Sequence, residues 1–228
     1  MESYKKNTVK AEKQLKPNQY VKFFDIENKG PRILFAGNSI TLHGYLPEIG
    51  WHGEWGMAAS SEDKDYVHLL MESIKKDAPD AAFCLAQVFM WESNYTIGCE
   101  KHSIYEAARD FDADIIIMRF CENCFGSYEK EPFEREYALF ADYLGVDKGA
   151  KAVFTSGFWK HQGADVSIEQ TAKQKNMPFV YLGDLGDDDS MKAIGLFEHS
   201  GVASHPGDLG MQNIADRIYK CIKENGWL

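Results

Sequence analysis

The sequence predicts a single α/β domain in which a mostly parallel, five-stranded sheet lies between two layers of helices. Two observations lead to this fold class. The chain has 228 residues, of which 44% are hydrophobic, enough for one substantial core but short for two complete domains. Nearly continuous apolar runs also alternate with amphipathic stretches, and such a repeated strand–helix–strand order implies right-handed parallel crossovers. We therefore expect a three-layer α/β/α sandwich.

Apolar runs mark the predicted strands. Each run is nearly continuous in apolar residues rather than alternating, which is typical of a strand buried on both faces of a parallel sheet. The runs are Arg32 to Ala36, Ala82 to Met90, Asp114 to Arg119, Lys151 to Thr155 and Pro178 to Leu182.

The stretches between these runs carry apolar residues at three- and four-residue spacing, as helices packed on a sheet do. We predict helices over Asp65 to Lys76, Glu131 to Leu144 and Asp165 to Lys175. Asp208 to Glu224 is the predicted closing helix, with Asp208 as its N-cap.

Residues 1–30 are rich in Lys, Glu and Asn and are predicted to form an N-terminal arm. An aromatic patch at Tyr20, Phe23 and Phe24 is expected to pack this arm on the domain, which spans residues 31–228. The first residues lack the apolar stretch of a secretory signal, so we expect a cytoplasmic protein. No apolar run approaches the roughly 20 residues of a membrane-spanning helix.

The net charge of −10 and the pI near 5.2 argue against two classes of partner. An acidic surface repels phosphate backbones and anionic lipid headgroups, so we expect neither nucleic acid nor a membrane as partner. Five scattered cysteines do not make a disulfide framework. Cys121 and Cys124 form a CxxC pair that a redox or zinc site could use, but Cys84, Cys99 and Cys221 supply no second pair. We expect no metal and no cofactor.

The turn after the first predicted strand carries a serine at the carboxyl edge of the sheet, where open α/β sheets bind their ligands. In the segment ILFAGNSIT, Gly37 permits a tight turn before Ser39. If a helix begins just after Ser39, the backbone N–H of this serine is placed to stabilise an oxyanion. An ordinary N-cap serine would give the same pattern, whereas a phosphate loop is excluded because no Gly-Lys-Ser/Thr follows.

The segment Gly37 to Thr41, GNSIT, resembles the GDS(I/L)T block that carries the nucleophile of SGNH (GDSL-like) hydrolases. Asn38 replaces the usual Asp of that block. The position of the segment, after the first buried strand, is also that of the family. The resemblance implies a flavodoxin-like sheet, a catalytic domain over residues 31–228, and Ser39 as the nucleophile of an esterase.

Asn123 follows the third predicted strand and matches the Asn of the family's GxND block, whose side-chain amide donates to the oxyanion. A neutral amide suits this task because it stabilises developing charge without titrating. Cys121 and Cys124 stand where the block has Gly and Asp, so only the key residue matches. A loop asparagine without this role is the alternative.

The loop before the closing helix contains a His-Pro pair that resembles the family's DxxHP block, and the resemblance makes His205 the general base. Val202 stands where the block has its Asp. Glu198, Asp208 or a backbone carbonyl could orient the imidazole instead, and a Ser-His dyad is chemically adequate. His199 and His205 as metal ligands are an alternative that no nearby carboxylate cluster supports.

The family's second block supplies a backbone N–H from a glycine after the second strand, and this chain has no glycine there. Glu92 or Ser93 could supply that donor. The aromatic, Gly-rich segment Gly44 to Ser61 is long for a connection and could form a wall of the site, although its tryptophans could equally pack on the domain itself. The residues expected to contact substrate are Asn38, Trp51, Trp55, Glu92, Glu122 and Trp159.

These residues together predict a serine esterase that acts through a Ser39 acyl-enzyme, with His205 as base and Asn123 as an oxyanion donor. The expected partner is a small acyl ester, with an acetylated carbohydrate preferred to a lipid-like ester or a thioester. A catalytically inactive carbohydrate-binding module of the same fold is the alternative. A flavodoxin-like nucleotide binder is disfavoured because GNSITLHG lacks a phosphate loop.

Overall fold

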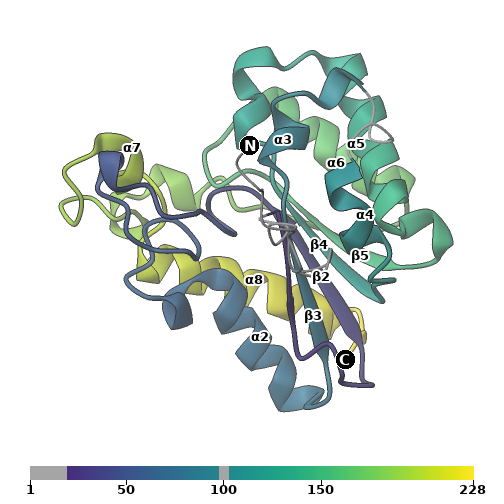
Figure 1. Ribbon diagram of the computed structural model, residues 1–228. Coiled ribbons are helices and arrows are strands. Elements are labelled where there is room, and N and C mark those ends of the chain that lie inside the picture. Colours follow the sequence, from purple (N-terminus) through teal and green to yellow (C-terminus); the bar gives the residue numbers. More distant parts are fainter. Residues whose placement is uncertain (1–19, 98–102) are drawn as a thin grey trace, which may run out of the picture.

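A computed structural model describes residues 20–97 and 103–228, and it confirms the predicted fold class. Strands form one sheet in the order β1-β3-β2-β4-β5-β6, with helices on both faces (Figure 1). Neighbouring strands are parallel except β1 and β3, which are antiparallel. The strands are β1 Val21–Phe24, β2 Arg32–Gly37, β3 Ala82–Gln87, β4 Ile115–Arg119, β5 Lys151–Thr155 and β6 Phe179–Val180.

The sheet has six strands rather than the predicted five, and the additional one is β1. This strand belongs to the segment expected to be an arm, and it pairs with β3 from Val21 opposite Ala86 to Phe24 opposite Phe83. An edge strand does not need the continuous apolar run by which central strands are recognised, and Phe23 is 43% exposed. Residues 1–19 of the predicted arm, and Cys99, lie outside the described residues.

Two helix layers enclose the sheet because successive residues of each strand point to opposite faces. In β2, Ile33 and Phe35 pack towards α2 and α8, whereas Leu34 and Ala36 pack towards the layer of α4, α5 and α6 (Figure 1). These helices are α2 Tyr66–Asp77, α4 Glu106–Arg109, α5 Lys130–Leu144, α6 Gln162–Gln174 and α8 Asp208–Glu224.

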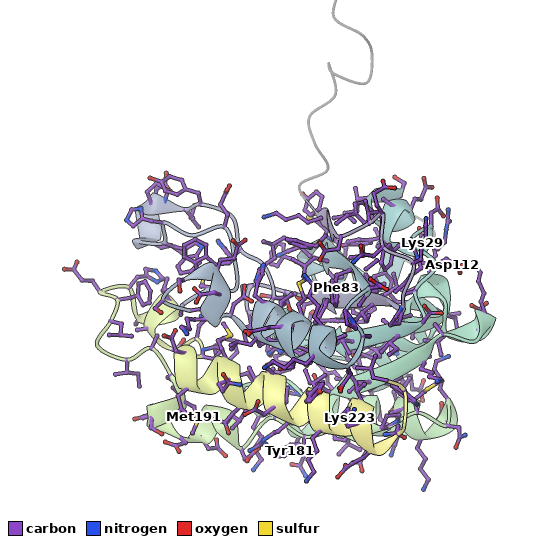
Figure 2. The ribbon with its side chains drawn as sticks, turned by 90° about the horizontal axis from the view of Figure 1, so that it is seen from below. Lys29, Phe83, Asp112, Tyr181, Met191 and Lys223 are labelled. Carbon is purple, nitrogen blue, oxygen red and sulfur yellow. The ribbon has the colours of Figure 1, made fainter. Side chains whose placement is uncertain are left out.

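The closing helix α8 has the predicted bounds and runs beside α2 (Figure 2). Asp208 is its first helical residue, not its N-cap as predicted. The carboxylate of Asp208 instead accepts hydrogen bonds from the N–H (2.8 Å) and the hydroxyl (2.6 Å) of Ser60, in the loop before α2. At the other end of the helix pair, Lys223 Nζ donates to Asp77 at 2.9 Å.

The second predicted strand is shorter than its apolar run. β3 ends at Gln87 because α3 (Phe89–Glu92) begins almost directly afterwards, and Val88 N–H makes a last bond to β2, at the carbonyl of Gly37 (2.7 Å). Another short helix, α7 (Ser200–Ala203), precedes α8. Among the helices in the described ranges, none has the length and apolarity needed to cross a bilayer.

Candidate active site

Ser39 lies in a tight turn at the carboxyl end of β2. The N–H groups of Thr41 and Leu42 both donate to the carbonyl of Asn38, each at 2.9 Å, which closes the turn. A Cβ atom at Gly37 would lie 1.7 Å from Thr41 Oγ1, so this position requires glycine. The sequence allowed for a helix that begins just after Ser39, but the structure has a turn there and no helix. The Ser39 N–H nevertheless has no acceptor within the described part of the chain.

His205 brings its imidazole to this serine from a loop 166 residues away. The Nε2 atom lies 3.0 Å from Ser39 Oγ. The Nδ1 atom lies 2.7 Å from the carbonyl oxygen of Gly201, which can only accept. Nδ1 therefore carries the proton, and the lone pair of Nε2 faces the serine hydroxyl. The ring of Trp159 packs edge-on against the imidazole, with 4.9 Å between ring centroids.

The charge state of His205 suits a base. Burial lowers the pKa of His205 to about 4, against the opposing effects of the Gly201 carbonyl and the Glu122 carboxylate, while Arg119 lowers it further. The imidazole is therefore neutral at pH 7 and can accept a proton.

Neither carboxylate considered as an orienting acid contacts His205. Asp208 binds Ser60, as described above, and Glu198 is exposed and makes no side-chain hydrogen bond or ion pair among the described residues. Val202, which stands in the sequence where the DxxHP block has its Asp, lies in the one-turn helix α7, and this helix presents the backbone carbonyl of Gly201 to the imidazole. Of the alternatives left open by the sequence, the backbone carbonyl is the one present.

Asn123 lies near Ser39 and His205 and lines the same pocket. It belongs to a 3-10 helix, Glu122–Ser127, that follows β4. Its Nδ2 atom donates to Glu92 Oε2 at 2.6 Å. An amide nitrogen carries two hydrogens, so one N–H remains for a ligand. The three residues predicted to form the catalytic site therefore meet at one place.

A buried polar network, formed by Asn38, Glu92, Arg119 and Glu122, lies beneath this site. Asn38 Nδ2 donates to Glu92 Oε1 at 3.0 Å and to Glu122 Oε2 at 2.6 Å. Arg119 forms an ion pair with Glu122 and donates to Asn38 Oδ1 at 3.1 Å. Each of the four side chains therefore has at least one hydrogen-bond partner, although Arg119 Nε is buried and has no partner among the described residues.

The two carboxylates of this network have opposite pKa shifts. Burial and the nearby Glu122 carboxylate raise the pKa of Glu92 to about 7. Burial also opposes the ionisation of Glu122, but the Arg119 guanidinium and the hydrogen bond from Phe158 N–H outweigh it and lower the pKa of Glu122. Glu122 is therefore ionised at neutral pH, and Glu92 is close to its titration point.

The expectation that Asn38, Glu92 and Glu122 contact substrate differs from what the structure shows. Asn38 is 1% exposed and Glu92 is 0% exposed, and none of the three lines the pocket. The second-strand backbone donor is also absent where it was sought, because Glu92 N–H donates to Val88 and Ser93 N–H donates to Phe89 within the turn of α3. The network supports the site from below.

The tryptophans expected to form the wall of the site have other roles. Trp51 is 2% exposed and packs against Trp55 and Phe197 in a small cluster of its own. Trp55 Nε1 donates to the carbonyl of Ala59 at 3.0 Å within the same loop. The two rings thus pack on their own loop and, through Phe197, on the segment before α7. Trp159 is near the site, but it contacts the imidazole rather than lining the pocket.

The pocket above Ser39 is small and is bordered by a larger groove. Its volume is about 340 Å³, and its apolar lining comes from Ile49, Met57, Phe89 and Val202. The groove has a volume of about 940 Å³ and is lined by β1 and the loop after Ser39. The two hollows are contiguous, because both are lined by His43, Gln87 and Phe89.

The CxxC pair lies in the core. Cys121 and Cys124 are buried and free, and burial raises the pKa of both thiols. Within residues 20–97 and 103–228, no group of three or more His, Cys, Asp or Glu side chains is placed to hold a metal ion. His199 lines the pocket, and its Nδ1 atom accepts from Val202 N–H at 3.3 Å.

Comparison with protein-family models and with curated proteins finds no match, whereas several solved structures are similar at low identity. The psychrotrophic esterase EstA from Pseudoalteromonas sp. has a TM-score of 0.58 at 11% identity, over 85% of this chain and 97% of that one. A family two carbohydrate esterase from Clostridium thermocellum has a TM-score of 0.60 at 16% identity, over 87% of this chain and 65% of that one. An acetyl xylan esterase has a TM-score of 0.53 at 14% identity, over 84% of this chain and 99% of that one. The chain therefore shares the fold of SGNH (GDSL-like) esterases.

Proposed function

We propose that the protein is a serine esterase that hydrolyses small acyl esters. The observation that carries this proposal is the contact between Ser39 Oγ and His205 Nε2, at 3.0 Å, beside a pocket that Asn123 also lines. A serine hydroxyl that donates to a neutral imidazole provides the nucleophile and the general base that acyl transfer needs. The mechanism requires no cofactor.

In the first half-reaction, Ser39 Oγ attacks the ester carbonyl while His205 Nε2 takes the hydroxyl proton. The carbonyl oxygen becomes an oxyanion, to which the Ser39 N–H and the free N–H of Asn123 donate. When the carbon–oxygen bond to the alcohol breaks, the imidazolium gives its proton to the departing oxygen, and the acyl group stays on Ser39.

In the second half-reaction, His205 takes a proton from water, and the hydroxide oxygen attacks the acyl carbon. The oxyanion collapses, the acid leaves, and Ser39 Oγ regains its proton from the imidazolium. The Gly201 carbonyl holds the Nδ1 proton throughout and partly compensates the positive charge, the task that an Asp performs in a triad.

We further propose that the substrate is a short acyl ester of a carbohydrate. The apolar pocket of about 340 Å³ beside Ser39 suits an acetyl or similarly short acyl group. The contiguous groove, with Tyr20 and Phe23 on its wall, offers room and aromatic rings for the alcohol part. A carbohydrate esterase and an acetyl xylan esterase of the same fold support this choice.

Covalent labelling tests the proposal. A fluorophosphonate probe should attach to Ser39 in the wild-type protein, as located by peptide mapping, and should not attach to the Ser39→Ala variant. One similar structure is an esterase inhibited by monoethylphosphonate, which supports the choice of probe. His205→Ala should lower kcat on p-nitrophenyl acetate by about a thousandfold or more. His52→Ala, at an exposed histidine away from the pocket, is the matched control and should keep its activity.

A folded wild-type protein that neither binds the probe at Ser39 nor hydrolyses acetyl esters would contradict the esterase proposal and favour the non-catalytic carbohydrate-binding module. The substrate class is tested separately with acetyl, butyryl and longer p-nitrophenyl esters. We expect kcat/KM to fall as the acyl chain lengthens, and a preference for long chains would contradict the short-acyl assignment.

A further inference from the structure

Asn123 is an exposed residue whose side chain is held by a fully buried one. Its amide nitrogen lies 2.6 Å from Glu92 Oε2, and Glu92 is 0% exposed. The torsion that turns an asparagine amide is broad, so an exposed amide without a partner would sample both of its orientations. The contact with Glu92 removes this freedom.

The chemistry of the carboxylate selects one of the two orientations. An ionised carboxylate accepts hydrogen bonds and cannot donate, so Glu92 can face the nitrogen of the Asn123 amide but not its oxygen. The reverse orientation would place the Asn123 oxygen against a negative charge. It would also turn the amide oxygen, rather than an N–H, towards the oxyanion.

We propose that Glu92 is a positioning residue, which fixes the Asn123 amide so that its second N–H serves the oxyanion formed at Ser39. This inference rests on the proposed esterase function. Glu92 reaches the amide from the buried end of α3, beneath the pocket, and makes no contact with substrate.

The surroundings of Glu92 fit this role. Asn38 Nδ2 donates to its other oxygen, Oε1, at 3.0 Å, so both carboxylate oxygens have a donor. Its charged or titratable neighbours are Glu122, Tyr105, Cys121, Cys124 and Tyr137. Arg119 compensates Glu122, not Glu92. Burial and the Glu122 carboxylate raise the pKa of Glu92 to about 7, so its charge is lost as the pH falls through this value.

Glu92→Gln tests the inference, with Glu136→Gln as the matched control. Glu136 is also buried, at 5% exposure, but it lies on α5, away from the site. A glutamine at position 92 has one acceptor oxygen for the two amide donors, so the Asn123 amide loses its selected orientation. We expect kcat on p-nitrophenyl acetate to fall roughly 10- to 100-fold with little change in KM, because removal of a whole oxyanion donor costs about 100- to 1,000-fold. Glu136→Gln should retain wild-type kcat.

A double-mutant cycle separates positioning from general destabilisation. If Glu92 acts through Asn123, then Glu92→Gln should change kcat by less than about twofold in the Asn123→Ala background. The titration of Glu92 should give the wild-type profile of kcat/KM a step near pH 7, and this step should be absent from both single variants. Effects of Glu92→Gln and Asn123→Ala that multiply, or a Glu92→Gln variant as active as wild type, would overturn the inference.

An activity-independent measurement distinguishes failure of this inference from failure of the esterase proposal. In nitrogen-15 spectra, the Asn123 side-chain amide resonances, assigned by their loss in Asn123→Ala, should shift in Glu92→Gln but not in Glu136→Gln. They should also titrate near pH 7. Resonances that do not respond to Glu92→Gln overturn the positioning role. If the resonances shift in Glu92→Gln but the wild-type protein has no esterase activity, the catalytic part of both proposals is overturned and only the contact between Glu92 and Asn123 is retained.

Discussion

Replacing Asn38 by Asp would restore the residue usual in the nucleophile block, yet we expect it to destabilise this chain. The Asn38 amide donates to Glu92 at 3.0 Å and to Glu122 at 2.6 Å. An aspartate has no hydrogen to donate, so Asn38→Asp would bring three carboxylates together around Arg119. The Asn at this position therefore compensates for the two buried acids beside it.

The magnitude follows from the two lost hydrogen bonds and from pH. A hydrogen bond to a charged group contributes about 1.5–3 kcal/mol, and Arg119 would bind the new carboxylate more strongly, so we expect a net loss of about 4 kcal/mol at pH 8. Burial and the adjacent acids raise the folded-state pKa of this carboxyl cluster above its unfolded value. The folded variant therefore binds the extra proton, and its stability relative to wild type rises as pH falls. One shared proton restores one hydrogen bond, which predicts a loss of about 2 kcal/mol at pH 5.

Urea unfolding at pH 8 and pH 5 measures both values. The double variant Asn38→Asp/Glu92→Gln should recover only about half of the stability lost at pH 8. A glutamine at position 92 can donate to the aspartate at position 38, but Glu122 Oε2 still faces a carboxylate and has lost its amide donor. An Asn38→Asp variant with wild-type stability at pH 8, or with a deficit that does not shrink at pH 5, would refute the bridging role of Asn38.

The remaining predictions concern pH, the serine turn and the cysteines. Because burial lowers the pKa of His205 to about 4, the final acid limb of kcat/KM should lie near pH 4, and a pH–rate profile that ends near 6.5 would contradict this environment. Gly37→Ala would place a Cβ atom 1.7 Å from Thr41 Oγ1, so we expect a loss of about 1–3 kcal/mol in urea unfolding together with lower esterase activity. The thiols of Cys121 and Cys124 are buried and have raised pKa values, so iodoacetamide should modify them only after denaturation, and mass-spectrometric detection of either label on the native protein would count against this.

Local sequence patterns predicted the central strands and the long helices, because burial on two faces and burial on one stripe leave different periods in the sequence. The segment Arg32 to Ala36 and strand β2, Arg32–Gly37, differ by one residue, and the closing helix Asp208–Glu224 has the bounds that were predicted. Strand β1 was missed because an edge strand carries a weak form of the same signal: Val21 is buried, and its neighbours are partly exposed.

The candidate site was predicted in part, for a related reason. Short blocks identified Ser39, Asn123 and His205, and the structure brings all three to one pocket. No local pattern distinguishes a tryptophan on a pocket wall from one that packs within the domain, and Trp51 is of the second kind. The sequence placed Glu92 among the residues that contact substrate, whereas its partners are Asn38 and Asn123. These partners lie far from Glu92 in the sequence, so no local pattern reveals them.

By itself, the sequence determined the α/β class, the order of the elements and the residue types at the turns, since each depends on neighbours within a few positions. The tertiary structure decided which groups complete the site: the Gly201 carbonyl that holds His205, and the Asn38, Arg119 and Glu122 groups around Glu92. These choices depend on hydrogen bonds between side chains far apart in the sequence, such as the 81 positions between Asn38 and Arg119, and on the burial that shifts their pKa values. Both are set only when the strands come together in one sheet.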